Sequence, residues 1–273
     1  MKNEIRSFCL FVRNDSRSES IADSIRELND CSGKPLQESI DGDLVIAIGG
    51  DGTFIDSVTS TNFSKNKIYA GIHTGTLGFM QNLSENEIFT LIKYIQYEKE
   101  IKTRKVLVSK VVVNLNNDKT LEFKSLNEVL VVGKNYSKIS FSEYVNGELL
   151  QNVTGNGIII ATNTGDTAYS MNSGGAIDFS NHFQLVCTLE TPIKNAAYER
   201  FITNPIICSK VLIIPKISSN ISVIIDGITR EIIPEEIKDI AVSIDGSDYI
   251  NKLELESFSK VNIIRNKILG YEV

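Results

Sequence analysis

The chain has 273 residues, of which 23% are charged, and a formal net charge of −6. This length suits one large domain or two ordinary ones, with a core that needs no disulfide or metal to hold it. A mildly acidic chain lacks the positive charge with which nucleic acids and anionic membranes are usually bound, so neither is an expected partner.

Cysteine and histidine usage gives no sign of a metal site or a disulfide framework. The four cysteines contain no CxxC pair, and the chain has only two histidines. The apolar run near the N-terminus is too short for a signal peptide, and no stretch approaches the length of a membrane span. We therefore expect a reduced, cytoplasmic protein without a protein-bound metal.

The first hundred residues alternate apolar runs with polar segments that have helical periodicity. Apolar runs at 7–12, 43–48 and 67–73 are separated by SRSESIADSIRELND and followed by SENEIFTLIKYIQYEKE. This alternation predicts an α/β domain over residues 1–102, with a parallel, Rossmann-like sheet between helices. Ser84 and Glu87 have the spacing of a capping box, and four apolar residues follow at helical spacing, Ile88, Leu91, Ile92 and Ile95.

From Thr103 onward, β-branched residues dominate and the helical periodicity disappears. The runs KVLVSKVVVNLNN, LEFKSLNEVLVVG and KISFSEYVNGELL are strand-like, and Asn146-Gly147 is a dipeptide typical of hairpin turns. We predict an all-β sandwich over residues 103–251. The tail, residues 252–273, is expected to pack back on the first domain.

The predicted strand at 44–48 runs directly into GGDGT at 49–53. Glycines at positions 49, 50 and 52 let a ligand approach the main chain, and a helix starting near Thr53 would favour phosphate oxygens. A carboxylate repels phosphate, so Asp51 suggests a group that handles a cation or accepts a proton from an attacking hydroxyl. The alternative is a plain glycine turn in which Asp51 only caps the helix. A Walker-type NTPase is excluded because the chain contains no GxxxxGK[ST].

A second glycine-rich stretch, residues 155–177, repeats the pattern of an apolar strand followed by a polar turn. Thr162, Thr164 and Thr167 place hydroxyl groups around Gly165, and Tyr169 follows. This density of donors would suit a nucleotide or a sugar, although an ordinary Ser/Thr/Asn loop is the alternative.

Together these stretches resemble the NAD kinase family, which transfers a phosphate from ATP or polyphosphate to the adenosine ribose of NAD. The resemblance covers most of the chain through GGDGT at 49–53, GIHTGTLGF at 71–79, LNEVLV at 126–131, TNTGDTAYSMNSGG at 162–175 and IDG at 225–227. The GGDGT motif alone is shared with diacylglycerol and sphingosine kinases and is related to a motif of phosphofructokinases. The later motifs are therefore what restrict the resemblance to the NAD kinase family.

The resemblance implies an α/β domain with a β-sandwich, Mg²⁺ or another divalent cation bound with ATP, NAD as the other substrate, and a homodimer or homotetramer. Asp51 would activate the ribose hydroxyl, Asn127 would contact the adenine, and Glu128 the ribose hydroxyls. Tyr198 would reach the site of a neighbouring subunit. The complete set of implied nucleotide-binding residues is Gly49, Gly50, Gly52, Thr53, Phe79, Asn127, Glu128, Asn156, Thr164, Asp166, Thr167, Ala168, Tyr169, Asn172, Tyr198 and Asp226.

Two positions depart from the family pattern. The family usually has GDG where this chain has Gly155-Asn156-Gly157, and TPTGSTAY where it has TNTGDTAY. The family's aspartate helps to bind the nicotinamide end, so Asn156 replaces an ionised acceptor with an amide that both donates and accepts. Asp166, conversely, would add a negative charge beside the nucleotide.

These departures leave other functions open. One is a related kinase acting on a different nucleoside-containing or polyol substrate, and another is a non-catalytic nucleotide-binding sensor. Asp51 and Glu128 argue against the sensor, because a sensor needs no base. Without the resemblance, Asn127 and Glu128 could form a solvated turn, and Asp226 could simply mark a hairpin.

Overall fold

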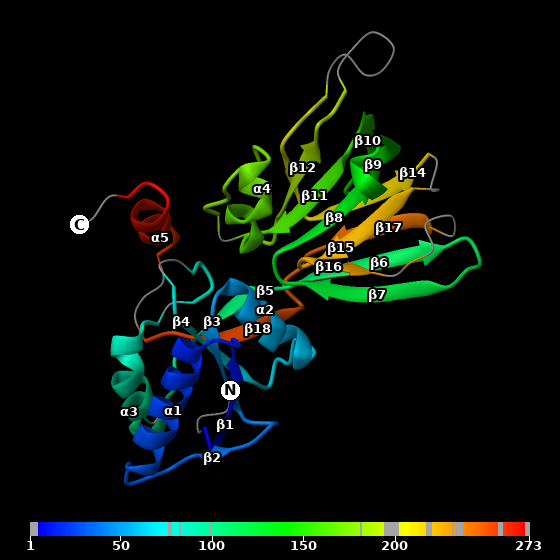
Figure 1. Cartoon of the computed structure of the whole chain (residues 1–273). Helices are drawn as coiled ribbons and strands as arrows, with labels where there is room; N and C mark the ends of the chain where they lie inside the picture. The colour runs from blue at the N-terminus through cyan, green and yellow to red at the C-terminus, as the bar shows by residue number, and fades with distance from the viewer. Residues whose placement is uncertain are drawn as a thin grey trace. The chain divides into compact units, whose positions relative to one another are not determined.

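The computed structural model describes residues 5–75, 78–81, 83–98, 100–180, 182–193, 202–216, 220–230, 232, 237–255 and 259–270 (Figure 1). The chain divides into two compact units, of which the first combines Met1–Val106 with Tyr249–Val273 and the second is Leu107–Asp248. The sequence places these divisions at 102/103 and 251/252, a few residues away. No helix among the described residues is both long and apolar enough to cross a membrane.

The first unit contains a six-stranded sheet in the order β2-β1-β3-β4-β18-β5. Its strands are β1 (Ser7–Val12), β2 (Gln37–Glu38), β3 (Leu44–Gly49), β4 (Ile68–His73), β5 (Thr103–Leu107) and β18 (Tyr249–Leu253). The described pairings of β1, β2, β3, β4 and β18 are all parallel, as predicted for an α/β domain. Strand β18, the last of the described strands, lies between β4 and β5, whereas the sequence places β5 in the second domain.

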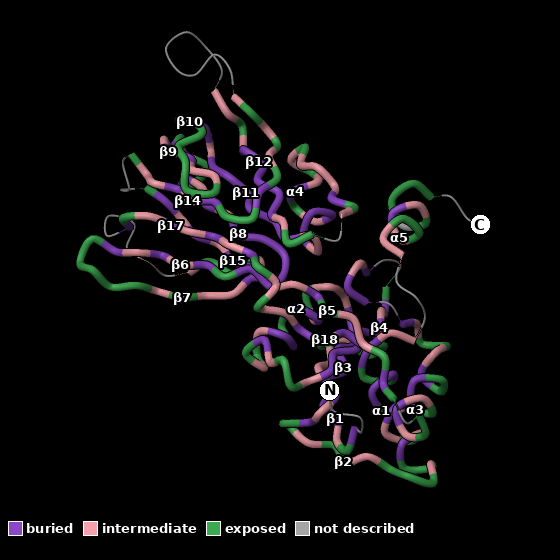
Figure 2. The backbone as a smooth tube through the Cα atoms, turned by 180° about the vertical axis from the view of Figure 1, so that it is seen from behind, coloured by how far each residue is buried: buried purple, intermediate pink, exposed green. Residues whose placement is uncertain are grey.

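The helices of this unit are α1 (Ser16–Asp30), α2 (Asp51–Ser60), α3 (Ile88–Tyr97) and α5 (Lys260–Lys267). Helices α1 and α3 lie side by side (Figure 1). The short 3-10 turn η1 (Glu85–Glu87) precedes α3, and Ser84 and Glu87 form the predicted capping box. All four apolar residues predicted for one face of α3 are buried. Strand β3 is buried along its entire length (Figure 2), so the end of this strand is held rigidly.

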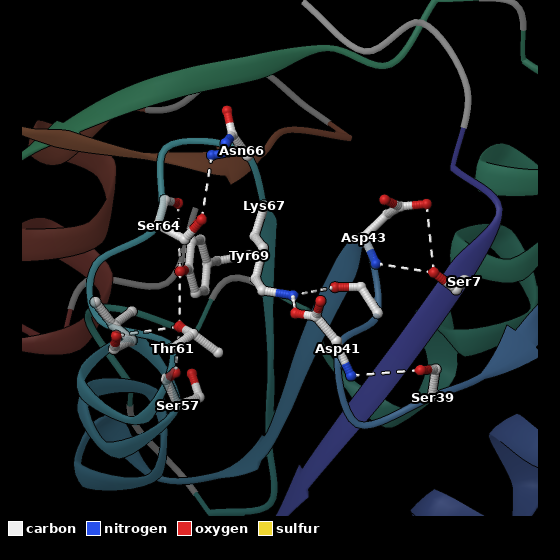
Figure 3. Close-up of polar contacts among 12 residues, drawn as sticks. Ser7, Ser39, Asp41, Asp43, Ser57, Thr61, Ser64, Asn66, Lys67 and Tyr69 are labelled. Carbon is white, nitrogen blue, oxygen red and sulfur yellow. Dashed lines mark hydrogen bonds and ion pairs between the residues drawn. The ribbon is translucent and has the colours of Figure 1, made fainter.

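The end of α2 is tied to the strand that follows it. The hydroxyls of Thr61 and Tyr69 lie 2.7 Å apart, and the Tyr69 side chain is fully buried (Figure 3). Nearby, Lys67 Nζ donates to Asp41 Oδ1 at 2.6 Å and to the carbonyl oxygen of Gly42 at 2.8 Å. These contacts join the loop before β3, the end of α2 and the start of β4.

The second unit is a β-sandwich, as predicted. One sheet has the order β10-β9-β14-β17-β6-β7 and the other has the order β13-β12-β11-β8-β15-β16. The first comprises β6 (Ser109–Leu115), β7 (Thr120–Ser125), β9 (Ile139–Val145), β10 (Glu148–Gly155), β14 (Lys210–Pro215) and β17 (Ile237–Ser243). The second comprises β8 (Glu128–Gly133), β11 (Gly157–Thr162), β12 (Leu185–Glu190), β13 (Ile206–Cys208), β15 (Ile221–Ile225) and β16 (Ile228–Arg230).

Alternating side chains of both sheets form one apolar core. Val111 and Val113 from β6 and Val129 and Val131 from β8 belong to this core, and all four are fully buried. The predicted hairpin joins β9 to β10, where Asn146 and Gly147 both have positive φ, 51° and 98°. The described residues of this unit also include three short helical turns, η2 (Lys134–Tyr136), η3 (Gly165–Thr167) and α4 (Tyr169–Asn172).

Candidate active site

The GGDGT turn lies at the carboxyl end of β3. Gly50 is the N-cap of α2, which begins at Asp51, two residues before the predicted start. A Cβ at Gly49 would lie 2.5 Å from Thr53 Oγ1 and 2.8 Å from Arg13 Cβ, and φ is 153°, so the turn favours glycine at this position. A Cβ at Gly50 or Gly52 would meet no atom within 4 Å, so this side of the turn is open to a ligand. The open glycines and the N-terminus of α2 form an arrangement suited to phosphate.

The Asp51 carboxylate is fixed by a segment that follows β4. Its Oδ2 accepts from the backbone N–H of Phe79 and its Oδ1 from that of Met80, each at 2.9 Å. The buried Gln81 donates from Nε2 to the carbonyl oxygen of Gly50 at 2.5 Å. Because a carboxylate has about four acceptor positions, two remain for a hydroxyl or a cation. Gln81 was not identified from the sequence, since its partner is a backbone carbonyl distant in the chain.

In the second unit, Asn127 and Glu128 are both 8% exposed at the start of β8. Asn127 Oδ1 and Glu128 Oε2 are buried and make no hydrogen bond within the described part of the protein. The pKa of Glu128 is raised to about 7, mainly by burial and to a smaller extent by the negative charge of Asp226. A hydrogen bond from the backbone N–H of Tyr169 acts in the opposite direction and lowers the pKa. Buried oxygens without partners are costly, so these two side chains are candidates for contact with a ligand.

The second glycine-rich stretch packs directly against Asn127. A Cβ at Gly165 would lie 2.1 Å from the Asn127 carbonyl oxygen, so only glycine fits this position. Thr164 is half-buried, Thr167 is buried, and Ala168 leads into the exposed Tyr169 and Asn172. This stretch therefore combines a tightly packed turn with an accessible aromatic side chain.

Asp166 lies inside the loop that follows β11. Its side chain is fully buried, and its Oδ2 accepts from the backbone N–H of Asp178 at 2.7 Å. This contact joins the two ends of the loop that carries α4. The sequence places this charge beside the nucleotide because it cannot show which way the side chain turns.

Asn156 lies at the opposite end of β8 and β11 from Glu128. Gly157 pairs with Val132, whereas Glu128 pairs with Ala161, so the two positions are about 15 Å apart along the strands. Asn156 Nδ2 donates to the carbonyl oxygen of Tyr136, an interaction that an ionised aspartate could not make. The amide at this position therefore has a structural use within the chain.

One further acidic residue on the same sheet was missed from the sequence. Glu190 ends β12, its Oε1 is buried without a hydrogen-bond partner in the described residues, and its carbonyl accepts from Asn156 N–H. Burial raises the pKa of Tyr169, and the charges of Glu190 and Tyr136 add to that effect. No local motif marks Glu190. Tyr198, which was predicted to reach a neighbouring subunit, lies outside the described residues.

The fold matches solved structures of nicotinamide-nucleotide kinases. Yeast NADH kinase complexed with NADH superposes with a TM-score of 0.85 at 17% identity, covering 99% of this chain and 89% of that one. An NAD kinase from Archaeoglobus fulgidus in complex with ATP gives a TM-score of 0.68 at 18% identity, covering 96% and 97%. At these identities the likeness shows a shared fold.

Sequence relatives give the family. The bifunctional NADP phosphatase/NAD kinase of Methanocaldococcus jannaschii is 32% identical over 238 residues, or 80% of this chain and 40% of its own length. The NAD kinase of Lactobacillus delbrueckii subsp. bulgaricus is 33% identical over 200 residues, or 70% of this chain and 73% of its own. Residues 126–194 match the ATP-NAD kinase C-terminal domain family. With identity at this level over most of a relative's length, the chain belongs to the NAD kinase family.

Proposed function

We propose that this chain transfers a phosphate group from ATP to the 2′-hydroxyl of the adenosine ribose of NAD, giving NADP. The observation that carries the proposal is the Asp51 carboxylate, which two backbone amides orient at an open glycine turn and helix N-terminus. The family supplies the substrate class, since the relatives described above are named as kinases of NAD or NADH.

In this reaction the ribose 2′-oxygen attacks the γ-phosphorus of ATP, Asp51 accepts the proton of that hydroxyl, and ADP leaves. Backbone N–H groups of the turn and the first residues of α2 stabilise the phosphate oxygens. Asn127 contacts the adenine and Glu128 accepts from ribose hydroxyls, while Thr167, Ala168 and Tyr169 hold the base and the ribose. The buried, unpartnered oxygens of Asn127 and Glu128 and the exposed side chain of Tyr169 support the roles of these three residues.

Mg²⁺ enters this proposal with ATP. Among the described residues, no group of three or more His, Cys, Asp or Glu side chains is placed to hold a metal ion. This fits Mg²⁺, which in phosphoryl-transfer sites is held largely by phosphates and water with one or two carboxylates. Asp51 is the carboxylate that could contact it, and the ion would neutralise phosphate charge.

Three further features belong to the proposal, the superfamily and the oligomer through the resemblance and the location through cysteine usage and the absence of signal-like segments in the sequence. The fold would share its superfamily with diacylglycerol kinases and phosphofructokinases, the protein would be cytoplasmic, and it would form a homodimer or homotetramer. Light scattering coupled to size-exclusion chromatography measures the oligomeric state directly, and a monomer at all concentrations would contradict the last of these.

The activity is tested by incubating the purified chain with Mg²⁺-ATP and NAD and separating the nucleotides by chromatography. We expect NADP and ADP in equal amounts. Parallel reactions with polyphosphate as donor, and with NADH as acceptor, define the substrates. Tight binding of NAD without formation of NADP, with every donor, would contradict the kinase and favour a nucleotide sensor.

A further inference from the structure

We infer that Asp226 is a positioning residue, which holds the segment 125–128 in its ligand-binding conformation and does not itself contact the nucleotide. The inference rests on the proposed function for the identity of the nucleotide, but its structural part does not. It changes the role given to Asp226 by the family resemblance, which counts the residue among those that bind substrate.

Asp226 occupies the tight turn between β15 and β16. Ile225 pairs with Ile228, so Asp226 and Gly227 are the two central residues, and both have positive φ, 51° and 78°. Such a turn matches the twist of the strands, and aspartate tolerates the left-handed conformation better than most residues. The turn directs the carboxylate toward the segment that joins β7 to β8.

The carboxylate receives four donors from this segment. Oδ1 accepts from Ser125 Oγ and the Asn127 N–H, each at 2.8 Å, and from the Glu128 N–H at 3.2 Å. Oδ2 accepts from the Leu126 N–H at 2.8 Å. Each oxygen of an ionised carboxylate has about two acceptor positions, so Oδ1 is fully occupied and Oδ2 keeps one. Most of the acceptor capacity of Asp226 is therefore used by this segment.

The backbone geometry also shows what Asp226 does for the segment. Three consecutive N–H groups, at 126, 127 and 128, point to one carboxylate, an arrangement that forms around an anion. Without this charge, three buried donors would face one another unsatisfied. Asp226 therefore acts as an internal anion on which the segment is built.

Thr162 holds the other side of the same segment. Its hydroxyl donates to the carbonyl of Leu126 at 2.6 Å, and its N–H donates to the carbonyl of Asn127 at 2.8 Å. The same hydroxyl accepts from the N–H groups of Thr164 and Gly165, at 3.1 and 3.2 Å. Three sequence motifs, IDG, LNE and TNTG, are thus joined through one set of hydrogen bonds.

This arrangement explains why the side chains of Asn127 and Glu128 remain available. Their backbone groups bond to Asp226 and Thr162, whereas Asn127 Oδ1 and Glu128 Oε2 have no hydrogen-bond partner in the described protein. A fixed backbone holds both side-chain oxygens in place for a ligand before it binds, which lowers the entropic cost of binding. Loss of the anchor should weaken nucleotide binding although the anchor never touches the nucleotide.

The test is Asp226→Asn, which preserves the shape but replaces one acceptor with an NH₂ group. We expect hydrogen exchange of the amides at 126–128 to accelerate at least tenfold, and the KM for NAD to rise at least tenfold with a smaller change in kcat. The pKa of Glu128, followed by ¹³C NMR of its carboxyl, should fall because a neighbouring negative charge is gone. The matched control is Asp245→Asn, an exposed aspartate that accepts from Ser247 N–H in its own turn, and it should change none of these.

A second variant tests the inference if Asp226→Asn fails to fold. Thr162→Val removes only the hydroxyl and should also accelerate exchange at 126–128, whereas Thr162→Ser should restore wild-type exchange. Loss of NAD binding in Asp226→Asn with exchange at 126–128 unchanged would overturn the inference, because Asp226 would then contact the ligand. Unchanged exchange and unchanged binding would overturn it as well.

The exchange measurement and a titration with NAD need no turnover. If the wild type forms no NADP, the proposed function fails while these measurements still decide the role of Asp226.

Discussion

The carboxylate of Asp51 accepts a hydrogen bond from the backbone N–H of Phe79, 28 residues later in the chain, at 2.9 Å. The adjacent N–H of Met80 binds the other oxygen at the same distance. The GGDGT turn and the segment after β4 are therefore one hydrogen-bonded unit. This explains how a carboxylate can remain oriented on a turn that contains three glycines and is otherwise open.

A substitution in the glycine turn should lower the activity without lowering the stability of the fold. Gly52 lies in the first turn of α2, and a Cβ there meets no protein atom within 4 Å, so Gly52→Ala should raise the free energy of unfolding by about 0.5–1 kcal/mol. The added methyl would displace the phosphate chain, so kcat/KM should fall by about 10²-fold. Ser60→Ala, at the exposed far end of α2, should leave activity unchanged. Wild-type activity in Gly52→Ala would contradict the phosphate cradle.

Glu128 predicts a pH dependence of stability. Burial and then the Asp226 charge raise its pKa from 4.5 to about 7, so folding takes up a proton in this window. The free energy of unfolding should therefore fall as the pH rises from about 4.5 to 7, with a share from Glu128 of about 3 kcal/mol. Burial also raises the pKa of Asp226, which acts in the same direction.

Glu128→Gln isolates the share of Glu128. Denaturant unfolding measured between pH 4.5 and 8 should show a smaller loss of stability with pH in this variant than in the wild type. An identical slope in both proteins would show that Glu128 keeps an ordinary pKa in the folded state.

The same substitution should affect binding more than chemistry. Gln cannot supply the charged acceptor for ribose hydroxyls, so we expect the KM for NAD to rise about tenfold with kcat nearly constant. Glu122→Gln is the control, because Glu122 is an exposed residue of β7 paired with the half-exposed Lys110. A large fall in kcat with constant KM would instead place Glu128 in the transition state.

The family pattern implies that an aspartate at position 156 would improve the use of NAD, whereas the structure leads us to expect no improvement. Asn156→Asp would place a carboxylate against the Tyr136 carbonyl that now accepts from the amide, so we expect a loss of about 0.5–1.5 kcal/mol in stability from this exposed hydrogen bond. We also expect no gain in kcat/KM for NAD. Asn152→Asp is a matched control, since Asn152 accepts from Ser142 through its oxygen, which aspartate retains. A rise in kcat/KM in Asn156→Asp would show that this position contacts the nicotinamide end.

Local features of the sequence predicted much of the fold. The capping box at Ser84, the buried face of α3 and the Asn146-Gly147 hairpin each depend on residues a few positions apart, where periodicity and turn preferences act directly. The insertion of β18 between β4 and β5 could not be predicted in this way. It depends on pairing between strands separated by most of the chain.

The same limit applies to the candidate site. The residue types in the motifs predicted Asp51, Asn127 and Glu128 as candidate site residues. They did not predict which polar groups form hydrogen bonds within the chain itself. Asp226 lies about a hundred residues from the segment that it anchors, with a separation of 98 to 101 positions. The Asp166 carboxylate accepts a hydrogen bond from a backbone N–H within its own loop. Such assignments follow from side-chain direction, which motif spacing does not contain.

The most direct test of the central claim is single-turnover transfer of phosphate from Mg²⁺-ATP to NAD by the wild type and by Asp51→Asn, with both substrates saturating. We predict that the wild type forms NADP phosphorylated at the ribose 2′-oxygen, and that Asp51→Asn binds both nucleotides but transfers phosphate about 10²–10⁴-fold more slowly. Equal transfer rates in the two proteins at equal nucleotide occupancy would contradict the role of Asp51 as the base.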